Sequence, residues 1–317
     1  MLTVSHKAKQ FLILTAKLLI VAGAFYFIYN RLADNNDVDW QKLLAALKTD
    51  SIGIIALILL LTFLNRFIEI LKWQNLVSWL QHLSLSKATE QVLAGVTTGI
   101  FTPNGIGEYA AKALYFKKQQ AKTIIFLNLI CNGIQLFIAV IAGIIGLIIF
   151  NYMFNVLPDF AVPGIAGVLA VIGFILFKAR KITIRGYSLQ LLYKRIAEIP
   201  KKIHNKNNAL ALLRYIALLH QHYFIFLLFD VYLPYPVMIS TIAAVYFVGS
   251  SLPTFQFLDF AVRGSVAVYF FGIVGVNEWV VVLAATLQWL LNIVIPVSIG
   301  SIYVINFKRQ DSTTLPH

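Results

Sequence analysis

Residues 88–118 read ATEQVLAGVTTGIFTPNGIGEYAAKALYFKK, an apolar stretch that is interrupted near its middle. The interruption comprises Thr102, Pro103, Asn104, Gly105 and Gly107. Lysines flank both ends, Lys87 before the stretch and Lys117 and Lys118 at its end, and basic residues beside apolar segments mark the cytoplasmic side of a membrane. A break rich in proline and glycine is tolerated at membrane depth only where the freed backbone groups are buried in protein or line a wet cavity. The stretch therefore predicts a re-entrant hairpin, residues 88–118, that enters the membrane from the cytoplasm.

The composition of the whole chain agrees with a membrane setting. Of 317 residues, 59% are hydrophobic and 12% are charged, whereas a soluble domain carries about 25% charged residues. The net charge of +13 is concentrated in short loops beside apolar segments, which is the positive-inside pattern and not a nucleic-acid-binding pattern. We expect an all-α integral membrane protein whose partners are membrane lipids, with anionic headgroups at the cytoplasmic face and no nucleic acid.

Six segments are long and apolar enough to cross about 30 Å of hydrocarbon. They are residues 11–30, 52–72, 123–150, 162–178, 212–230 and 279–305. The basic, amphipathic loop 178–214 is predicted to be cytoplasmic. Lysine and arginine also flank the terminal spans, so we expect both termini in the cytoplasm of a multi-pass protein in a cell membrane of the bacterial inner-membrane type.

A second interrupted stretch, residues 237–276, is broken around Pro253, and its two arms are short for membrane spans. Its ends lie outside, which predicts a hairpin of the opposite orientation. A shift of about 150 residues places Pro103 near Pro253, as expected for an internal repeat. We therefore predict two repeats, residues 1–155 and 156–317, each with three spans and one hairpin. Because three is odd, the repeats are inverted in topology.

The alternative is eight spans, in which both arms of the second stretch cross the membrane and the first stretch lies at the interface. The distribution of charge permits both topologies, since the C-terminus stays inside in each.

Each hairpin carries an acid and a base four residues apart, Glu108 with Lys112 and Asp259 with Arg263. Intramembrane ionisable residues usually mark a transport pathway, so one hypothesis has the bases hold a lipid phosphate while the acids position them or accept protons. The competing hypothesis is that each pair locks its hairpin, because a charge at membrane depth needs a partner.

Other polar residues lie within predicted spans. Arg66 either faces the same cavity or extends to the interface, and Asn132, Gln288 and Asn292 contact substrate or form interhelical hydrogen bonds. The two histidines of one span, His220 and His222, lack a second pair at ligand spacing, so we expect no metal site. We find no nucleophile, phosphate-binding or dinucleotide motif, and expect no cofactor.

The element Thr-Pro-Asn-Gly-Ile-Gly-Glu followed by Lys112, together with Pro253 and the Asp259–Arg263 pair, resembles the flippase-like proteins related to the transmembrane region of lysylphosphatidylglycerol synthase. The resemblance covers essentially the whole chain. It implies a membrane domain that moves or binds an amphiphilic lipid, in some relatives fused to an aminoacyl-transfer domain. We expect no such domain here, because the longest polar stretch is the 178–214 loop.

The leading hypothesis is thus a lipid translocase acting on a phospholipid or lipid-linked substrate, a transporter and not an enzyme. One alternative is an integral membrane transferase that uses a lipid-linked donor, with Glu108 or Asp259 as general base, although no further acid lies near either one in the sequence. The other alternative is a non-catalytic subunit of envelope assembly.

Overall fold

The computed structural model describes residues 51–100, 102, 105–156, 158, 188–251 and 259–307, scattered positions between 164 and 181, and only the backbone of residues 259–261. The predicted span 11–30 lies outside the described residues, and so does most of the predicted span 162–178. The side chains of Pro103, Asn104, Pro253 and Asp259 also lie outside them.

Every regular element of the described residues is helical. The elements are α3 Ile52–Val77, α4 Leu85–Gly99, α5 Ile106–Leu114, η2 Lys118–Gln120, α6 Ala121–Phe154, α8 Leu189–Glu198, α9 Lys201–Leu228, α10 Tyr235–Ser251, α11 Asp259–Ile273, α12 Glu278–Trp289, η3 Leu290–Val294 and α13 Ile295–Asn306.

Four helical segments of the described residues are long and apolar enough to cross a membrane. They are Ile52–Val77, Lys118–Phe154, Lys201–Leu228 and Glu278–Asn306. Each contains or overlaps one of the predicted spans 52–72, 123–150, 212–230 and 279–305. The protein is therefore an all-helical, multi-pass membrane protein.

The predicted loop 178–214 was too long. Helix α9 begins at Lys201, directly after Pro200, so that Arg214 lies well inside a helix and not at the end of a loop. Pro200 suits a helix start because it has no N–H to leave unpaired, and the following polar residues continue the helix beyond its apolar part. Helix α8, with Ser188 as its N-cap, occupies part of the remaining connection.

Glycines and a threonine form the break between α4 and α5. Gly105 has a φ of +71°, a left-handed conformation that residues with a Cβ rarely adopt. A Cβ at Gly107 would lie 2.5 Å from the carbonyl oxygen of Thr98, so only glycine lets the two arms come this close. The Thr102 hydroxyl donates to the Gly99 carbonyl at 2.8 Å and accepts from the Gly107 N–H at 2.8 Å. In the described part of the break, the Thr102 side chain thus connects the end of α4 to the start of α5.

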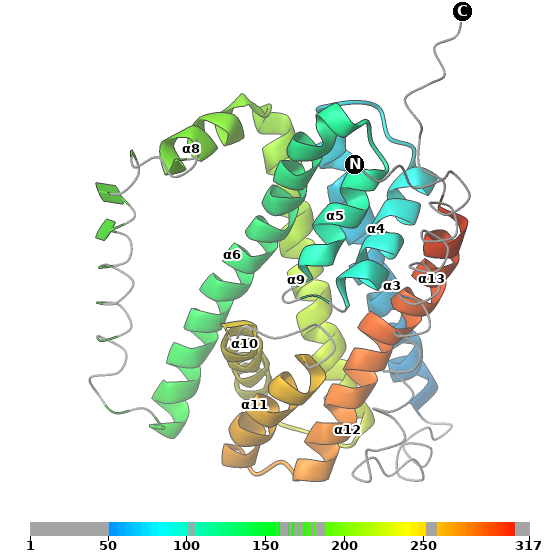
Figure 1. Cartoon of the computed structure of the whole chain (residues 1–317). Coiled ribbons are helices and arrows are strands. Elements are labelled where there is room, and N and C mark those ends of the chain that lie inside the picture. The colour runs from blue at the N-terminus through cyan, green and yellow to red at the C-terminus, as the bar shows by residue number, and fades with distance from the viewer. Residues whose placement is uncertain are drawn as a thin grey trace, which may run out of the picture.

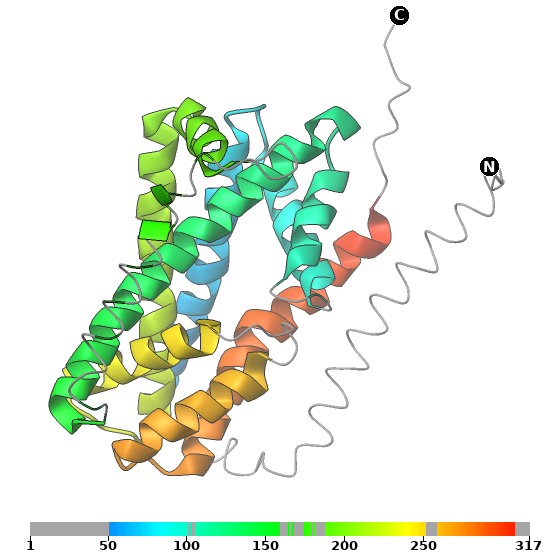
Figure 2. The ribbon, with the colours of Figure 1, turned by 60° about the vertical axis from the view of Figure 1, so that its left-hand side comes forward.

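The two pairs of short helices lie toward opposite ends of the helical body. Figures 1 and 2 show α4 and α5 toward the end that carries α8, and α10 and α11 toward the other end. Helices α3 and α9 pack along each other, α6 packs against α10, and α13 packs against α4.

Glycines permit the last two of these contacts. A Cβ at Gly143 of α6 would lie 2.1 Å from the Cβ of Phe247 on α10, and a Cβ at Gly300 of α13 would lie 2.3 Å from the carbonyl oxygen of Leu93 on α4. These glycines therefore allow α6 to pack closely on α10 and α13 to pack closely on α4. Helices α4 and α10 are the first arms of the two broken segments.

Candidate functional site: a buried polar cluster between α3, α5, α6 and α9

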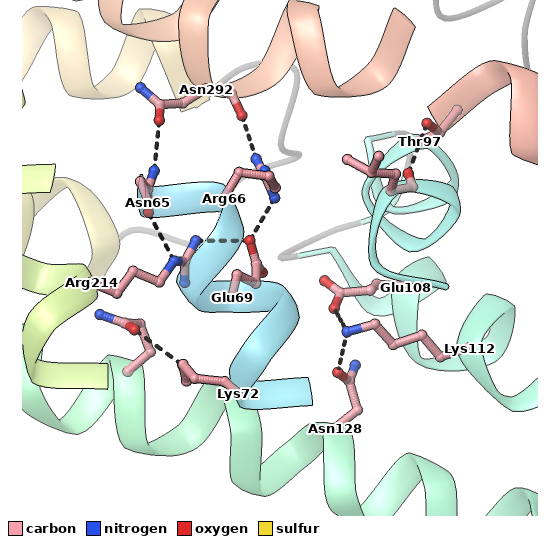
Figure 3. Close-up of polar contacts among 12 residues, drawn as sticks. Asn65, Arg66, Glu69, Lys72, Thr97, Glu108, Lys112, Asn128, Arg214 and Asn292 are labelled. Carbon is pink, nitrogen blue, oxygen red and sulfur yellow. Dashed lines mark hydrogen bonds and ion pairs between the residues drawn. The ribbon is translucent and has the colours of Figure 1, made fainter. Parts of the chain in front are cut away.

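The centre of the site is an ion network between α3 and α9 (Figure 3). Glu69 accepts from Arg66 at 2.5 Å, three residues earlier on α3, and from Arg214 of α9 at 3.1 Å. Arg214 also donates through Nε to the side-chain oxygen of Asn65 at 2.9 Å. By helical rise, Arg66 and Arg214 each lie roughly 17 to 21 Å from the two ends of their helices. The network is therefore near the middle of the two helices.

Asn292 connects this network to the last span. Its side-chain oxygen accepts from Asn65 at 2.7 Å, and its backbone carbonyl accepts from Arg66 at 2.7 Å. The carbonyl is available because the residue four positions later is Pro296, which has no N–H to donate to it. Asn292 itself lies in the π-helical turn η3, a deviation that often occurs at functional sites.

A second ion pair lies on α5, beside the central network. Lys112 donates to Glu108 at 2.5 Å and to the side-chain oxygen of Asn128 on α6 at 2.9 Å. Its Nζ also lies 4.4 Å from the centre of the Trp73 ring, within the range of a cation–π contact. Lys112 is fully buried and Glu108 is 7% exposed. The predicted pairing of Glu108 with Lys112 is thus present in the structure.

Gly95 of α4 makes room for this pair, since a Cβ there would lie 2.8 Å from the Cγ of Glu108. On the other broken segment, Gly249 has the same relation to Arg263, with a Cβ that would lie 2.8 Å from the Cγ of that arginine. In both segments, a glycine on the first arm accommodates a charged side chain of the second arm.

Lys72, one turn beyond Glu69 on α3, is a fully buried cation. It donates to the backbone carbonyl of Cys131 at 3.0 Å and to the side-chain oxygen of Gln135 at 3.1 Å, both on α6. Among the described residues it forms no ion pair with a carboxylate. It lies close enough to Glu69, Arg214 and Lys112 for their charges to interact.

A chain of amides extends from the central network toward α10. Gln221 of α9 donates to Thr62 at 2.5 Å and accepts from Asn292 at 3.1 Å. Gln288 donates to Gln221 at 3.3 Å and to the Tyr246 hydroxyl at 2.9 Å. On the far side of that tyrosine, the Arg263 guanidinium lies 5.6 Å from the ring centre. Polar side chains therefore continue from α5 to α11.

Of the residues predicted as substrate-binding, the structure brings together Glu108, Lys112, Arg66 and Asn292, and it connects Gln288 and Arg263 to them through the amide chain. Asn132 instead lies to the side, where it donates to the Tyr109 hydroxyl at 3.4 Å. Gln288 and Asn292 do form interhelical hydrogen bonds, as one of the two hypotheses for them expected.

Sequence reasoning left four residues of the cluster out of the site: Arg214, Glu69, Lys72 and Asn128. Arg214 was assigned to the basic loop. Glu69 was grouped with Arg66, either facing the cavity or extending to the interface, and Lys72 was noted only as the base that follows them. Asn128 gave a usable signal, since it lies on the same predicted helix face as Asn132.

The geometry suits the binding of an anion. The described cluster holds two guanidinium and two ammonium groups against two carboxylates, and both guanidinium groups already contact an acid or amide that orients them. Arginine and lysine at a desolvated site are strong phosphate ligands. The described residues hold no group of three or more metal-ligating side chains.

Comparison with known proteins agrees with this setting. The model of the family described as "Lysylphosphatidylglycerol synthase TM region" matches residues 14–300. A search of curated proteins gave no match to the chain.

Proposed function

Because the chain belongs to the family of the lysylphosphatidylglycerol synthase TM region, we propose that it is a lipid translocase. It moves an amphiphilic lipid between the leaflets by passing the charged headgroup along the buried polar cluster while the tails stay in hydrocarbon. A charged headgroup needs such a route because an unpaired ion in the bilayer costs several kcal/mol.

The observation that carries the proposal is the ion network of Arg66, Glu69 and Arg214. It lies near the middle of helices α3 and α9 and belongs to both halves of the chain. Transporters built from repeats hold their substrate near the bilayer midplane, at the interface between the repeats. A purely structural helix pair in lipid would associate through small residues and neutral hydrogen bonds, without three charges between the two helices.

Reciprocal packing supports the inverted repeat. If α3 to α6 correspond to α9 to α13, then α3 and α9 are equivalent and pack on each other. The contact of α6 with α10 is then the counterpart of the contact of α13 with α4. The glycine contacts follow the same relation, since Leu93 and Thr97 face Gly300, and Ala243 and Phe247 face Gly143. Adding 150 to the numbers of Leu93 and Thr97 gives Ala243 and Phe247.

The lengths of α10 and α11 favour two opposed hairpins over eight spans. Helices α10 and α11 contain 17 and 15 residues, or about 25 and 22 Å at helical rise, which is short of about 30 Å of hydrocarbon. We place the hairpin of α4 and α5 on the cytoplasmic side with α8 and both termini, and the hairpin of α10 and α11 on the opposite side, in a membrane of the bacterial inner-membrane type.

Within this proposal, Lys112 and Arg263 contact the headgroup from the two hairpins. Glu108 and Asp259 orient them or exchange protons. The alternative role for each pair, a lock that holds its hairpin closed, predicts normal lipid movement once both members have been neutralised together.

Transfer chemistry is the second candidate, and an assembly subunit without activity is the third. The purified protein in liposomes that carry a fluorescent lipid separates the three. Chemical reduction of the label from outside measures movement between leaflets, and mass spectrometry of the extracted lipids detects a covalent product. Accelerated movement without a new product supports the translocase. A new lipid species supports the transferase. If the lipid neither moves nor changes chemically, the assembly subunit is supported.

A further inference from the structure

Among the described residues, the charges of the polar cluster do not balance. The described cluster holds the cations Arg66, Lys72, Lys112 and Arg214 and the carboxylates Glu69 and Glu108. Glu69 lies close enough to Lys72 and Lys112 for their charges to interact, and Arg66 and Glu108 are similarly close. The six groups therefore form one electrostatic unit with two positive charges in excess.

Two buried hydrogen-bond donors in or beside this unit lack a partner among the described residues. Asn128 is fully buried, and its side-chain nitrogen has no hydrogen-bond partner among the described residues. Its orientation is fixed, because its oxygen accepts from Lys112, which can only donate. The Nε of Arg66 is buried without a partner as well. Unfilled donors beside excess positive charge indicate an acceptor that carries negative charge.

The two carboxylates of the unit do not supply this acceptor. Of the two buried acids, Glu69 already bonds to both arginines and Glu108 to Lys112. The unit lies between α3, α5, α6 and α9. The side chains of Arg66 and Arg214 are 16% and 19% exposed and the other four charged residues are buried, so a bound group loses much of its water. A desolvated cluster gains most from a ligand that neutralises its whole excess charge.

We propose that the headgroup bound at this cluster carries at least two negative charges, as a phosphate monoester or a diphosphate on a lipid does, and is not zwitterionic or cationic. This inference rests on the proposed function, since it names the class of lipid that the translocase accepts. The family description mentions lysylphosphatidylglycerol, whose single phosphate and two amines give a net positive headgroup. The charge of this cluster opposes such a lipid.

The test compares ligand affinity by calorimetric titration of the full chain in neutral detergent. The probes are farnesyl diphosphate, short-chain phosphatidylglycerol, phosphatidylcholine, lysylphosphatidylglycerol and inorganic diphosphate. The expected result is an affinity for farnesyl diphosphate at least about tenfold higher than for any other probe. Equal or tighter binding of phosphatidylglycerol or lysylphosphatidylglycerol would overturn the inference. Equal binding of inorganic diphosphate would show that the site serves a soluble anion and not a lipid.

Two variants test whether the excess positive charge of this cluster selects the ligand. Asn128→Asp adds one negative charge with almost no change of shape, and it keeps an acceptor for Lys112. Lys72→Gln removes one positive charge. Each should lower the affinity for farnesyl diphosphate at least about tenfold and the affinity for phosphatidylglycerol by no more than about threefold. Equal losses for both lipids would contradict the proposal.

Matched controls make these losses interpretable. Asn208→Asp adds the same charge at an exposed position of α9, and Lys118→Gln removes a lysine from an exposed position. Neither should change the preference. Because Lys72→Gln alters a buried cation, Asn128→Asp keeps the proposal falsifiable if the lysine variant does not fold.

Failure of this inference differs from failure of the proposed function. Liposomes that move labelled diphosphate, zwitterionic and cationic lipids at equal rates would keep the translocase and reject the charge preference. Selective binding of farnesyl diphosphate without any lipid movement would keep the ligand class and reject translocation.

Discussion

Neutralising Glu108 should destabilise the protein strongly, because it leaves the Lys112 ammonium buried without its carboxylate. The side chains of the two residues are 9% and 1% exposed, and the ion pair is 2.5 Å long. Breaking a buried pair by removing one partner costs about 3 to 5 kcal/mol. Asn128 and the Trp73 ring remain beside the ammonium and reduce this cost, so we expect about 3 kcal/mol for Glu108→Gln.

The measurement is the free energy of unfolding in mixed micelles of neutral and denaturing detergent. The matched control is Glu90→Gln in α4, which breaks a pair with Lys87 of similar length, 2.8 Å. That pair is exposed, with 64% and 20% of its side chains accessible, and an exposed ion pair contributes about 0 to 1 kcal/mol. If Glu108→Gln costs no more than Glu90→Gln, the pair is solvated and our reasoning about its burial is refuted.

The double variant Glu108→Gln with Lys112→Gln extends this test to function. It should be more stable than Glu108→Gln alone, because no unpaired charge remains. We expect it to move lipid slowly nonetheless, because the headgroup has lost a cationic contact. A folded double variant that moves lipid at the normal rate would show that the pair only locks the hairpin.

Three further predictions concern the backbone. Gly107→Ala should lower the yield of folded protein, since its Cβ would clash with a carbonyl of α4, whereas Gly133→Ala, which meets nothing within 4 Å, should be tolerated; equal yields would argue against the close approach of the two arms. Pro296→Ala supplies an N–H that competes for the Asn292 carbonyl, so it should weaken the contact with Arg66 and slow lipid movement without preventing folding; an unchanged rate would remove that contact from the path. Thr102→Val should cost about 1 kcal/mol of stability because both ends of the turn lose their hydrogen bond, and an unchanged unfolding midpoint would contradict its capping role.

The sequence predicted the elements that depend on local chemistry. Long apolar runs gave the four spans that the described residues contain, and four-residue spacing gave the contact of Glu108 with Lys112. The Pro and Gly positions of residues 102–107 indicated where the helix stops. In each case the physical cause lies within a few neighbouring residues.

The central ion network was not predicted, because its causes are far apart in the chain. Arg214 follows a run of basic residues, and only the start of α9 at Lys201 places it in the middle of a helix. Glu69 bonds to Arg214 across 145 residues, a pairing that no local pattern shows. Pro296 after Asn292 was the one local indication of a freed carbonyl in the last span.

The most direct test of the account is the rate of lipid movement in liposomes that contain the double variant Glu69→Gln with Arg214→Gln. The variant removes one negative and one positive charge together, so it keeps the net charge of the cluster and leaves the spans intact. The account predicts that this variant folds, as judged by its unfolding midpoint and its elution as a single species, and moves a labelled anionic lipid no faster than liposomes without protein. Movement at the rate of the unaltered protein would show that headgroups do not pass through the network between α3 and α9.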